Sequence, residues 1–139
     1  MSFQDSKTVQ SNHERFIRHV IANETVYFLV NDDGVANSSS NDQDQTDVLP
    51  FWSHLAYAAR AARSFEENYE TETIELFDFL YRWLPGMSGD GVLAGTNWDA
   101  NLIGREIDPY ILRTELEEKM SPELLEKYEA KYDALSTDA

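Results

Sequence analysis

The sequence predicts an α+β fold in which about five helices pack on a small mixed, largely antiparallel sheet of about five strands. Amphipathic helical segments alternate with short runs of aromatic and β-branched residues. Turn signatures of the hairpin type join some of these runs, which favours antiparallel pairing. No segment repeats at a fixed period, so the chain does not have the pattern of a repeat protein.

The N-terminal part of the chain predicts a helix followed by a hairpin. Residues 1–10 are polar and predict a disordered tail. A capping box then precedes apolar residues at helical spacing, which predicts a helix over 11–22. The following residues predict a buried strand over 24–30. The Asn-Asp-Asp-Gly turn at 31–34 accepts positive φ angles, so a second strand over 34–37 completes a hairpin.

A polar segment leads into the next strand and helix. Residues 38–47 contain no apolar side chain, which predicts a mobile acidic surface loop. The run 48–52 predicts a strand, and Pro50 predicts that it lies at a sheet edge, because proline has no N–H to donate. Ser53 is placed to N-cap a helix over 53–64, whose alanines favour close packing on a sheet.

A strand over 72–75 precedes a strongly amphipathic helix. Apolar residues recur at helical spacing over 76–84, and we expect Pro85-Gly86 to end this helix. Residues 92–98 predict another strand, and residues 101–107 are expected to pair back on it as a hairpin.

Two helix-start signals close the chain, Asp108-Pro109 and Ser121-Pro122. We therefore expect a single domain over 11–120 and a C-terminal helical extension over 121–139. The helix over 121–135 carries an apolar stripe that must be buried, either on its own domain or on a second copy as a homodimer. The stripe consists of Leu124, Tyr128, Tyr132 and Leu135.

The composition excludes several classes of function. With 26 Asp and Glu against 11 Lys and Arg, the net charge of −15 argues against binding to nucleic acid or to an anionic membrane surface. Without cysteine there is no disulfide, zinc ribbon or thiol nucleophile. The apolar run 26–30 is too short to span a membrane, and the polar N-terminus lacks the pattern of a secretory signal. We therefore expect a cytoplasmic protein.

The negative charge is unevenly distributed. Residues 31–47 contain five Asp and no base, and residues 64–79 contain five Glu and one Asp. In the segment between them, residues 48–63, the only Lys, Arg, Asp or Glu residues are Arg60 and Arg63. These arginines are expected either to pair with the acidic segment that follows or to hold an anionic ligand.

A series of landmarks resembles a known family. They are an aromatic strand followed by Asp-Asp-Gly, then Leu49-Pro50-Phe51-Trp52, Tyr57-Ala58, Ile74, Phe79-Leu80, Trp83-Leu84-Pro85, Gly91-Val92, Asn97-Trp98-Asp99, Gly104 and Asp108-Pro109. Over most of its length the chain resembles the small bacterial family called domain of unknown function 2750. The long acidic loop and the helix after Ser121 depart from that pattern. The resemblance implies no activity, substrate or catalytic residue.

No catalytic, cofactor-binding or metal-binding motif is recognisable. The three histidines, His13, His19 and His54, lack metal-ligand spacing and are expected at the surface or at helix ends. The acidic turns lack the glycine and glutamate that a calcium loop requires. We therefore expect no metal and no cofactor, and an enzyme is the less favoured interpretation.

Polar and aromatic residues gather instead where strands are predicted to end. Because ligands and partners usually meet a scaffold there, the candidate binding residues are Trp52, Arg60, Asn97, Trp98 and Arg105. For Trp98, packing in the core is the competing interpretation. Two hypotheses follow. The first is a non-enzymatic protein-interaction module that uses its acidic surface, and the second is a small-ligand-binding protein or enzyme with its site at the strand ends.

Overall fold

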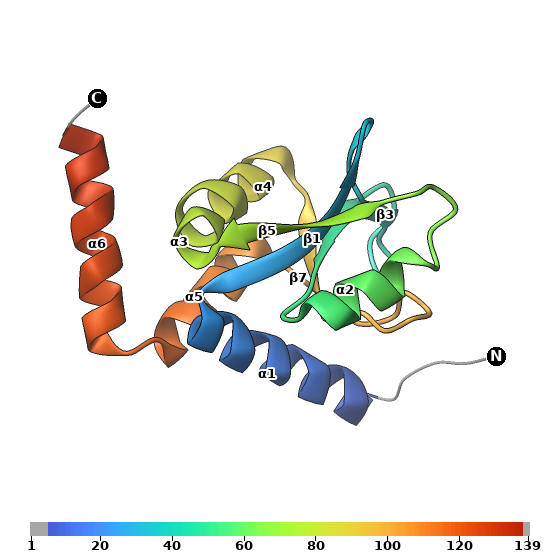
Figure 1. The fold of residues 1–139 in the computed structure, drawn as a ribbon, viewed down its shortest axis with the longest axis horizontal. Helices are drawn as coiled ribbons and strands as arrows, with labels where there is room; N and C mark the ends of the chain where they lie inside the picture. Colours follow the sequence, from blue (N-terminus) through green and yellow to red (C-terminus); the bar gives the residue numbers. More distant parts are fainter. Residues whose placement is uncertain (1–5, 138–139) are drawn as a thin grey trace.

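The computed structural model describes residues 6–137 and confirms the predicted α+β class. Helices surround two sheets, where we had expected one (Figure 1). The strands are β1 (Thr25–Asn31), β2 (Gly34–Val35), β3 (Ser38–Ser39), β4 (Asp47–Phe51), β5 (Glu70–Glu75), β6 (Leu93–Thr96) and β7 (Arg105–Ile107). The helices are α1 (Ser6–Asn23), α2 (Leu55–Ala62), α3 (Leu76–Asp78), the π-helical η1 (Phe79–Trp83), α4 (Leu84–Asp90), α5 (Pro109–Lys119) and α6 (Pro122–Thr137).

The strand orders are β2-β1-β5 and β3-β4-β6-β7, and every pair is antiparallel except the parallel pair β4 and β6. A backbone bridge joins the sheets, since Tyr27 of β1 and Trp52 exchange two N–H···O bonds of 2.9 Å. The buried side chains form two clusters. Residues of α1, α5 and the helical segment 76–90 fill one cluster, and α2 covers the other, which holds Trp52 and Trp98.

Pro50 does not place β4 at a sheet edge, so that prediction is wrong. β4 lies between β3 and β6. The carbonyl of Phe51 accepts a bond from the Asn97 N–H, so Phe51 faces β6 and Pro50 faces the opposite side. On that side β3 pairs only as far as Val48, and Trp52 provides the bridge to β1. Proline is tolerated because no partner strand needs its missing N–H.

The first helix is longer than predicted. It begins at Ser6, so residues 6–10 are helical, and the rest of the expected tail, residues 1–5, lies outside the described range. Gln10 Nε2 donates to Glu14 Oε1 one turn further on, at 3.1 Å. Such i,i+4 pairs support a helix, and no glycine or proline interrupts it upstream of the capping box.

The amphipathic helix also continues past its predicted end at Pro85-Gly86. It runs as α3, η1 and α4 to Asp90 and ends at Gly91, whose φ of 71° is left-handed. Proline lies in the first turn of α4, directly after the π-helical segment. The backbone stays helical through Trp83 and Leu84, and the Leu84 N–H donates to the Phe79 carbonyl five residues back. This wider turn accommodates Pro85, so the helix is not broken.

The acidic segment 38–47 is more structured than expected. Its first residues form the short strand β3, and the Glu106 carboxylate of β7 holds the residues that follow. Ser40 Oγ donates to Glu106 Oε1 at 2.5 Å, and the Asn41 N–H donates to Glu106 Oε2 at 2.8 Å. Hydrophobic patterning misses such an anchor because both partners are polar and lie far apart in the sequence.

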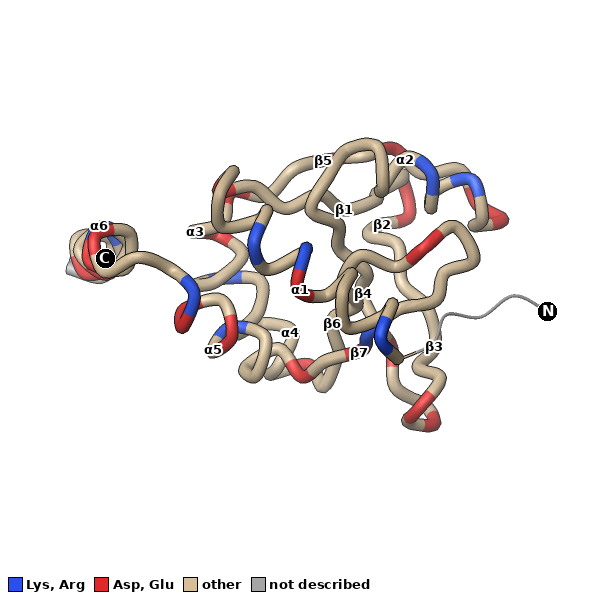
Figure 2. The backbone as a smooth tube through the Cα atoms, turned by 90° about the horizontal axis from the view of Figure 1, so that it is seen from below, with Lys and Arg blue, Asp and Glu red and all other residues tan. Residues whose placement is uncertain are grey.

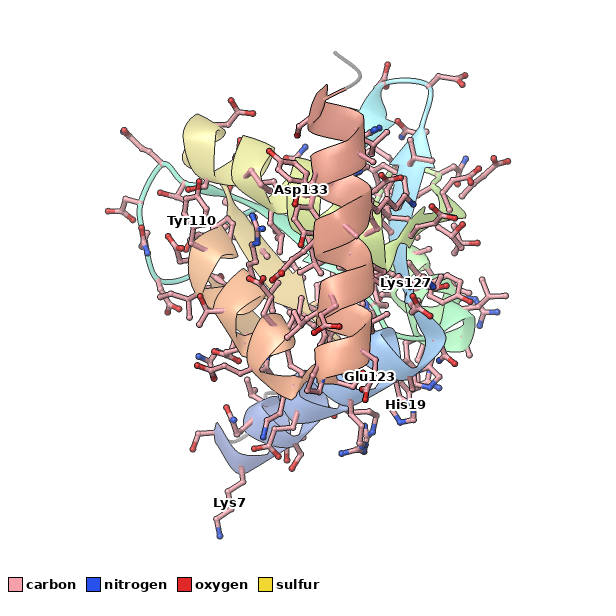
Figure 3. All side chains as sticks on the ribbon, turned by 90° about the vertical axis from the view of Figure 1, so that its left-hand side faces the viewer. Lys7, His19, Tyr110, Glu123, Lys127 and Asp133 are labelled. Carbon is pink, nitrogen blue, oxygen red and sulfur yellow. The ribbon has the colours of Figure 1, made fainter. Side chains whose placement is uncertain are left out.

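The last helix, α6, covers one end of the molecule and buries half of its stripe on its own chain (Figures 1 and 3). Tyr128 is 4% exposed, contacts the ring of Phe77 and donates from its hydroxyl to Glu24 Oε1 at 2.5 Å. Burial, together with this bond, raises the pKa of Tyr128 far above its ordinary value. The distal residues Tyr132 and Leu135 remain 46% and 47% exposed.

Candidate functional site

The candidate site lies at the carboxyl ends of the parallel strands β4 and β6. Their last residues, Phe51 and Thr96, are paired, and the Asn97 N–H donates to the Phe51 carbonyl at 2.9 Å. The chain after β4 enters α2, whereas the chain after β6 turns away into the loop 97–104. Adjacent parallel strands whose connections diverge leave a hollow beyond their carboxyl ends.

Asn97 fixes this divergence. Its φ of 47° is left-handed, a conformation that asparagine tolerates better than most residues. The amide oxygen accepts from the Ser53 N–H at 2.9 Å, and the amide nitrogen donates to Ser53 Oγ at 3.0 Å and to the Asn12 carbonyl at 3.2 Å. One buried side chain thus connects β6, the end of β4 and α1.

The N-cap of α2 is His54 and not the predicted Ser53, because the Ser53 hydroxyl is occupied by Asn97 and by His54 Nδ1 at 2.7 Å.

Two buried tryptophans hold the chain next to the hollow. Trp52 is fully buried and donates from Nε1 to the Trp98 carbonyl at 2.9 Å. Trp98 is 4% exposed and donates from Nε1 to the Arg105 carbonyl at 3.0 Å. Gly95 packs against the Trp98 ring so closely that an added Cβ would lie 2.5 Å from it, and Gly104 is similarly placed. Both tryptophans therefore have core positions, and Trp98 also contributes to the wall of the hollow.

The hollow itself, which we call the strand-end cleft, has a volume of about 230 Å³. Three segments line it, namely α1 with Asn12 and Arg15, α2 with Tyr57 and Arg60, and the loop over residues 97–100. Larger depressions lie elsewhere on the surface, including one of about 630 Å³ beside residues 63–71. In this cleft two arginines meet amide side chains from segments far apart in the sequence.

Positive charge exceeds negative charge around the cleft, because Arg15 and Arg60 line it together with one acid, Asp99. Arg15 Nη1 donates to Asn12 Oδ1 at 3.1 Å, and the ion pairs recorded over residues 6–137 include neither Arg15 nor Arg60. Asp99 is the acidic residue in the wall, and its Oδ1 accepts the N–H groups of Asn101 and Ile103 at 2.8 and 3.1 Å. Arg60 therefore does not pair with the acidic segment that follows it, which was the simpler of its two expected roles.

The pKa of His54 is affected by positive charges near the cleft. Its ring lies 4.6 Å from that of His19 and 4.5 Å from that of Tyr57, centroid to centroid. Burial lowers the pKa of His54 below 6.5, and the charges of His19 and Arg15 lower it further. The charges of His19 and Arg15 favour a nearby negative charge, whereas burial disfavours charge of either sign.

Arg105 is not part of the cleft. Its guanidinium lies between α1 and α5, where Nη1 donates to Gln10 Oε1 at 2.9 Å and Nη2 lies 3.8 Å from Glu115 Oε2. The same carboxylate holds His13, whose Nε2 is 2.6 Å from Glu115 Oε1 and whose Nδ1 is 2.7 Å from Thr96 Oγ1. His13 is 1% exposed, so the expectation of a surface or helix-end histidine is wrong for it. The hydroxyl of Thr96 is fully buried, which makes this cluster a link between α1, β6 and α5.

The structure brings together three of the candidate residues, Arg60, Asn97 and Trp98, around one cleft. Trp52 supports the cleft from below, and Arg105 lies elsewhere. Arg15 and Tyr57 also line the cleft, from α1 and α2, and the sequence patterns did not predict them as site residues. The polar face of α1 was the available signal, since Arg15 lies one helical turn after Asn12 on that face.

The described residues also bear on metal binding and on membrane insertion. No group of three or more His, Cys, Asp or Glu side chains within residues 6–137 is arranged to hold a metal ion. No helix in this range is both long and apolar enough to cross a membrane.

The fold and the site define a small α+β domain with a positively charged cleft beyond a parallel strand pair. The chain belongs to the family described as "Protein of unknown function (DUF2750)", whose model matches residues 13–116. This match confirms the family resemblance and runs from α1 into α5, so that the whole cleft lies within it except Asn12. No curated protein and no solved structure matches the chain.

Proposed function

We propose that this protein is a non-enzymatic binding module whose strand-end cleft holds a small anionic group, such as a phosphate or a carboxylate. The observation that carries the proposal is that two arginines, Arg15 and Arg60, line one cleft of a chain with a net charge of −15. A guanidinium presents several N–H donors in a plane, which matches the geometry of both anions. A cleft of about 230 Å³ suits one such group better than a drug-sized ligand, which fills about 300 Å³ or more.

The arrangement of the remaining polar groups favours binding over catalysis. The Ser53 hydroxyl beneath the cleft is buried and bonded to Asn97 and His54. The carboxylate of Asp99 accepts N–H groups of its own loop. The described cleft residues offer positive charge and amide groups. Ser53 contacts His54 but is only 1% exposed, and Asp99 is bonded within its own loop, so neither is placed to react with a ligand in the cleft.

The test is a titration of the full chain with inorganic phosphate and, separately, with succinate, followed by NMR. We expect both anions to shift resonances of Asn97, Ala100 and the α2 backbone. Arg60→Ala should weaken binding about tenfold or more, because it removes a charge-assisted contact. Arg63→Ala is the matched control, since Arg63 follows α2, is exposed and lines a different depression.

Equal affinities of the wild type and Arg60→Ala would contradict the proposal. Arg15→Ala provides a second check from the other wall of the cleft. Circular dichroism of each variant separates a loss of binding from a loss of fold.

We propose a protein-interaction module as the second candidate function, favoured by the acidic strand β5. Glu70, Glu72 and Glu75 are exposed and absent from the ion pairs recorded for residues 6–137. An acidic surface of this kind speeds the encounter with a basic partner. Affinity purification at low and moderate salt should recover a stoichiometric partner with a basic segment. Recovery of no such partner would count against this function.

A further inference from the structure

Strand β5 presents an unpaired backbone edge. It ends the order β2-β1-β5, and its six residues make it longer than the edge strands β2, β3 and β7, which have two, two and three residues. In Figure 2 it lies at the margin of the molecule, next to α2. A long edge strand is a template on which another extended chain can pair.

The register shows which residues of β5 face outward. Tyr27 gives its N–H and its carbonyl to Trp52, and the Leu29 carbonyl accepts from Ala36, so both residues face away from β5. Their partners across the ladder are Thr73 and Thr71. In an antiparallel ladder, partners that do not bond each other point their backbone groups to opposite sides. The N–H and carbonyl groups of Thr71 and Thr73 therefore face out from the sheet.

These outward groups have no recorded hydrogen-bond partner among residues 6–137. The side chains of Glu70 and Glu72 lie two residues apart, on the face of the strand opposite to the side chains of Thr71 and Thr73, and both glutamates are exposed. Two copies of this edge would place like charges opposite each other, which disfavours pairing of the protein with itself. The same carboxylates favour a strand that carries Lys or Arg at alternate positions.

We propose that β5 is a docking edge to which a basic extended segment of a partner protein adds as a further strand. Thr71 and Thr73 would supply the main-chain hydrogen bonds, and Glu70 and Glu72 would select a partner with two basic residues at i and i+2. The inference rests on the interaction-module function and is independent of the strand-end cleft.

The test uses a synthetic eight-residue peptide with Lys at alternate positions and Thr or Val between them, titrated against the full chain. Two control peptides are used. The first has the same composition, but its lysines are clustered. The second has the same sequence, but the backbone amides on its pairing edge are N-methylated. We expect the alternating peptide to bind at least tenfold more tightly than either control. Hydrogen exchange at the Thr71 and Thr73 amides should slow when it binds.

Two substitutions separate the backbone and the charge contributions. Thr73→Pro removes an N–H that faces outward, so it should leave the β1–β5 ladder intact and abolish binding. Thr73→Val is its matched control and should bind as the wild type does. Glu70→Lys/Glu72→Lys should lose the basic peptide and gain the corresponding peptide with Glu in place of Lys.

Equal binding of the clustered or N-methylated peptide would overturn strand addition, and so would undiminished binding to Thr73→Pro that folds normally. If Thr73→Pro unfolds, the N-methylated peptide still decides the question. A partner recovered from cells could bind the Glu70→Lys/Glu72→Lys variant as well as it binds the wild type. That result would refute β5 as the docking edge but would not contradict the protein-interaction function.

Discussion

At the scale of single residues, Asn97 holds the walls of the strand-end cleft in place. It makes three side-chain hydrogen bonds from a left-handed backbone conformation. Asn97→Ala leaves the buried Ser53 N–H without its side-chain acceptor, removes the bonds to Ser53 Oγ and to the Asn12 carbonyl, and strains the backbone. We therefore expect a loss of about 2–4 kcal/mol in the free energy of unfolding. Urea denaturation measures it.

Asn97→Gly serves as the control for this prediction. Glycine relieves the left-handed strain but does not restore the amide, so it should recover about 1 kcal/mol of the loss. Full recovery with glycine would show that the amide bonds contribute little, contrary to our account of the cleft.

His54 provides a residue-scale test of the field in the cleft. Burial first, and then the charges of His19 and Arg15, lower its pKa. A bound phosphate would offset part of the positive field and raise the pKa of His54 toward 6.5, and Arg15→Ala should raise it in the absence of phosphate. NMR titration of the imidazole resonances measures both effects. If the pKa of His54 does not change when phosphate is added, the anion binds elsewhere.

At the scale of elements, α6 contributes to stability even though it lies outside the matched family region. Tyr128 is buried against Phe77 and bonded to Glu24, so a chain truncated after Met120 should remain folded but lose about 2–4 kcal/mol of stability. Tyr128→Ala should reproduce most of that loss in thermal unfolding. An unchanged melting temperature would mean that α6 packs on nothing.

The same truncated chain tests the homodimer, which we propose as the use of the exposed half of the stripe. Tyr132 and Leu135 remain half-exposed on α6. Sedimentation should show a dimer of the full chain that truncation after Met120 converts to a monomer. A monomeric full chain would refute the homodimer.

Sequence patterning predicted the elements that local rules determine and missed those that depend on distant partners. The Asp108 N-cap is confirmed, because Asp108 Oδ1 accepts the N–H groups of the first helical turn. The edge position of Pro50 was wrong because it depends on where β3 stops and β1 begins to pair. Asn97 and Trp98 could be predicted from the end of a strand, and Arg60 from the basic segment between two acidic ones. The separation of Arg105 from them depends on Glu115 and Gln10, which no local pattern connects to it.

At the scale of the whole molecule, the charge of −15 is a source of self-repulsion as well as of solubility. Exposed carboxylates extend over the 38–47 segment, β5 and α6, and few are paired in the recorded ion pairs (Figure 2). Salt screens repulsion between such charges over about 10 Å at 0.1 M. Raising NaCl from about 10 to 200 mM should therefore raise the melting temperature by a few degrees, as differential scanning calorimetry would show.

A charge variant distinguishes repulsion from a specific ion effect. Glu66→Lys/Glu67→Lys changes two exposed side chains by two charges each, which takes the net charge from −15 to −11. If self-repulsion governs the salt response, this variant should be more stable than the wild type at low salt and gain less from added NaCl. A specific anion effect at the cleft would leave the response of this variant unchanged and would be abolished by Arg60→Ala. Because the cleft is positive and β5 is negative, the two variants assign the salt response to one surface or the other.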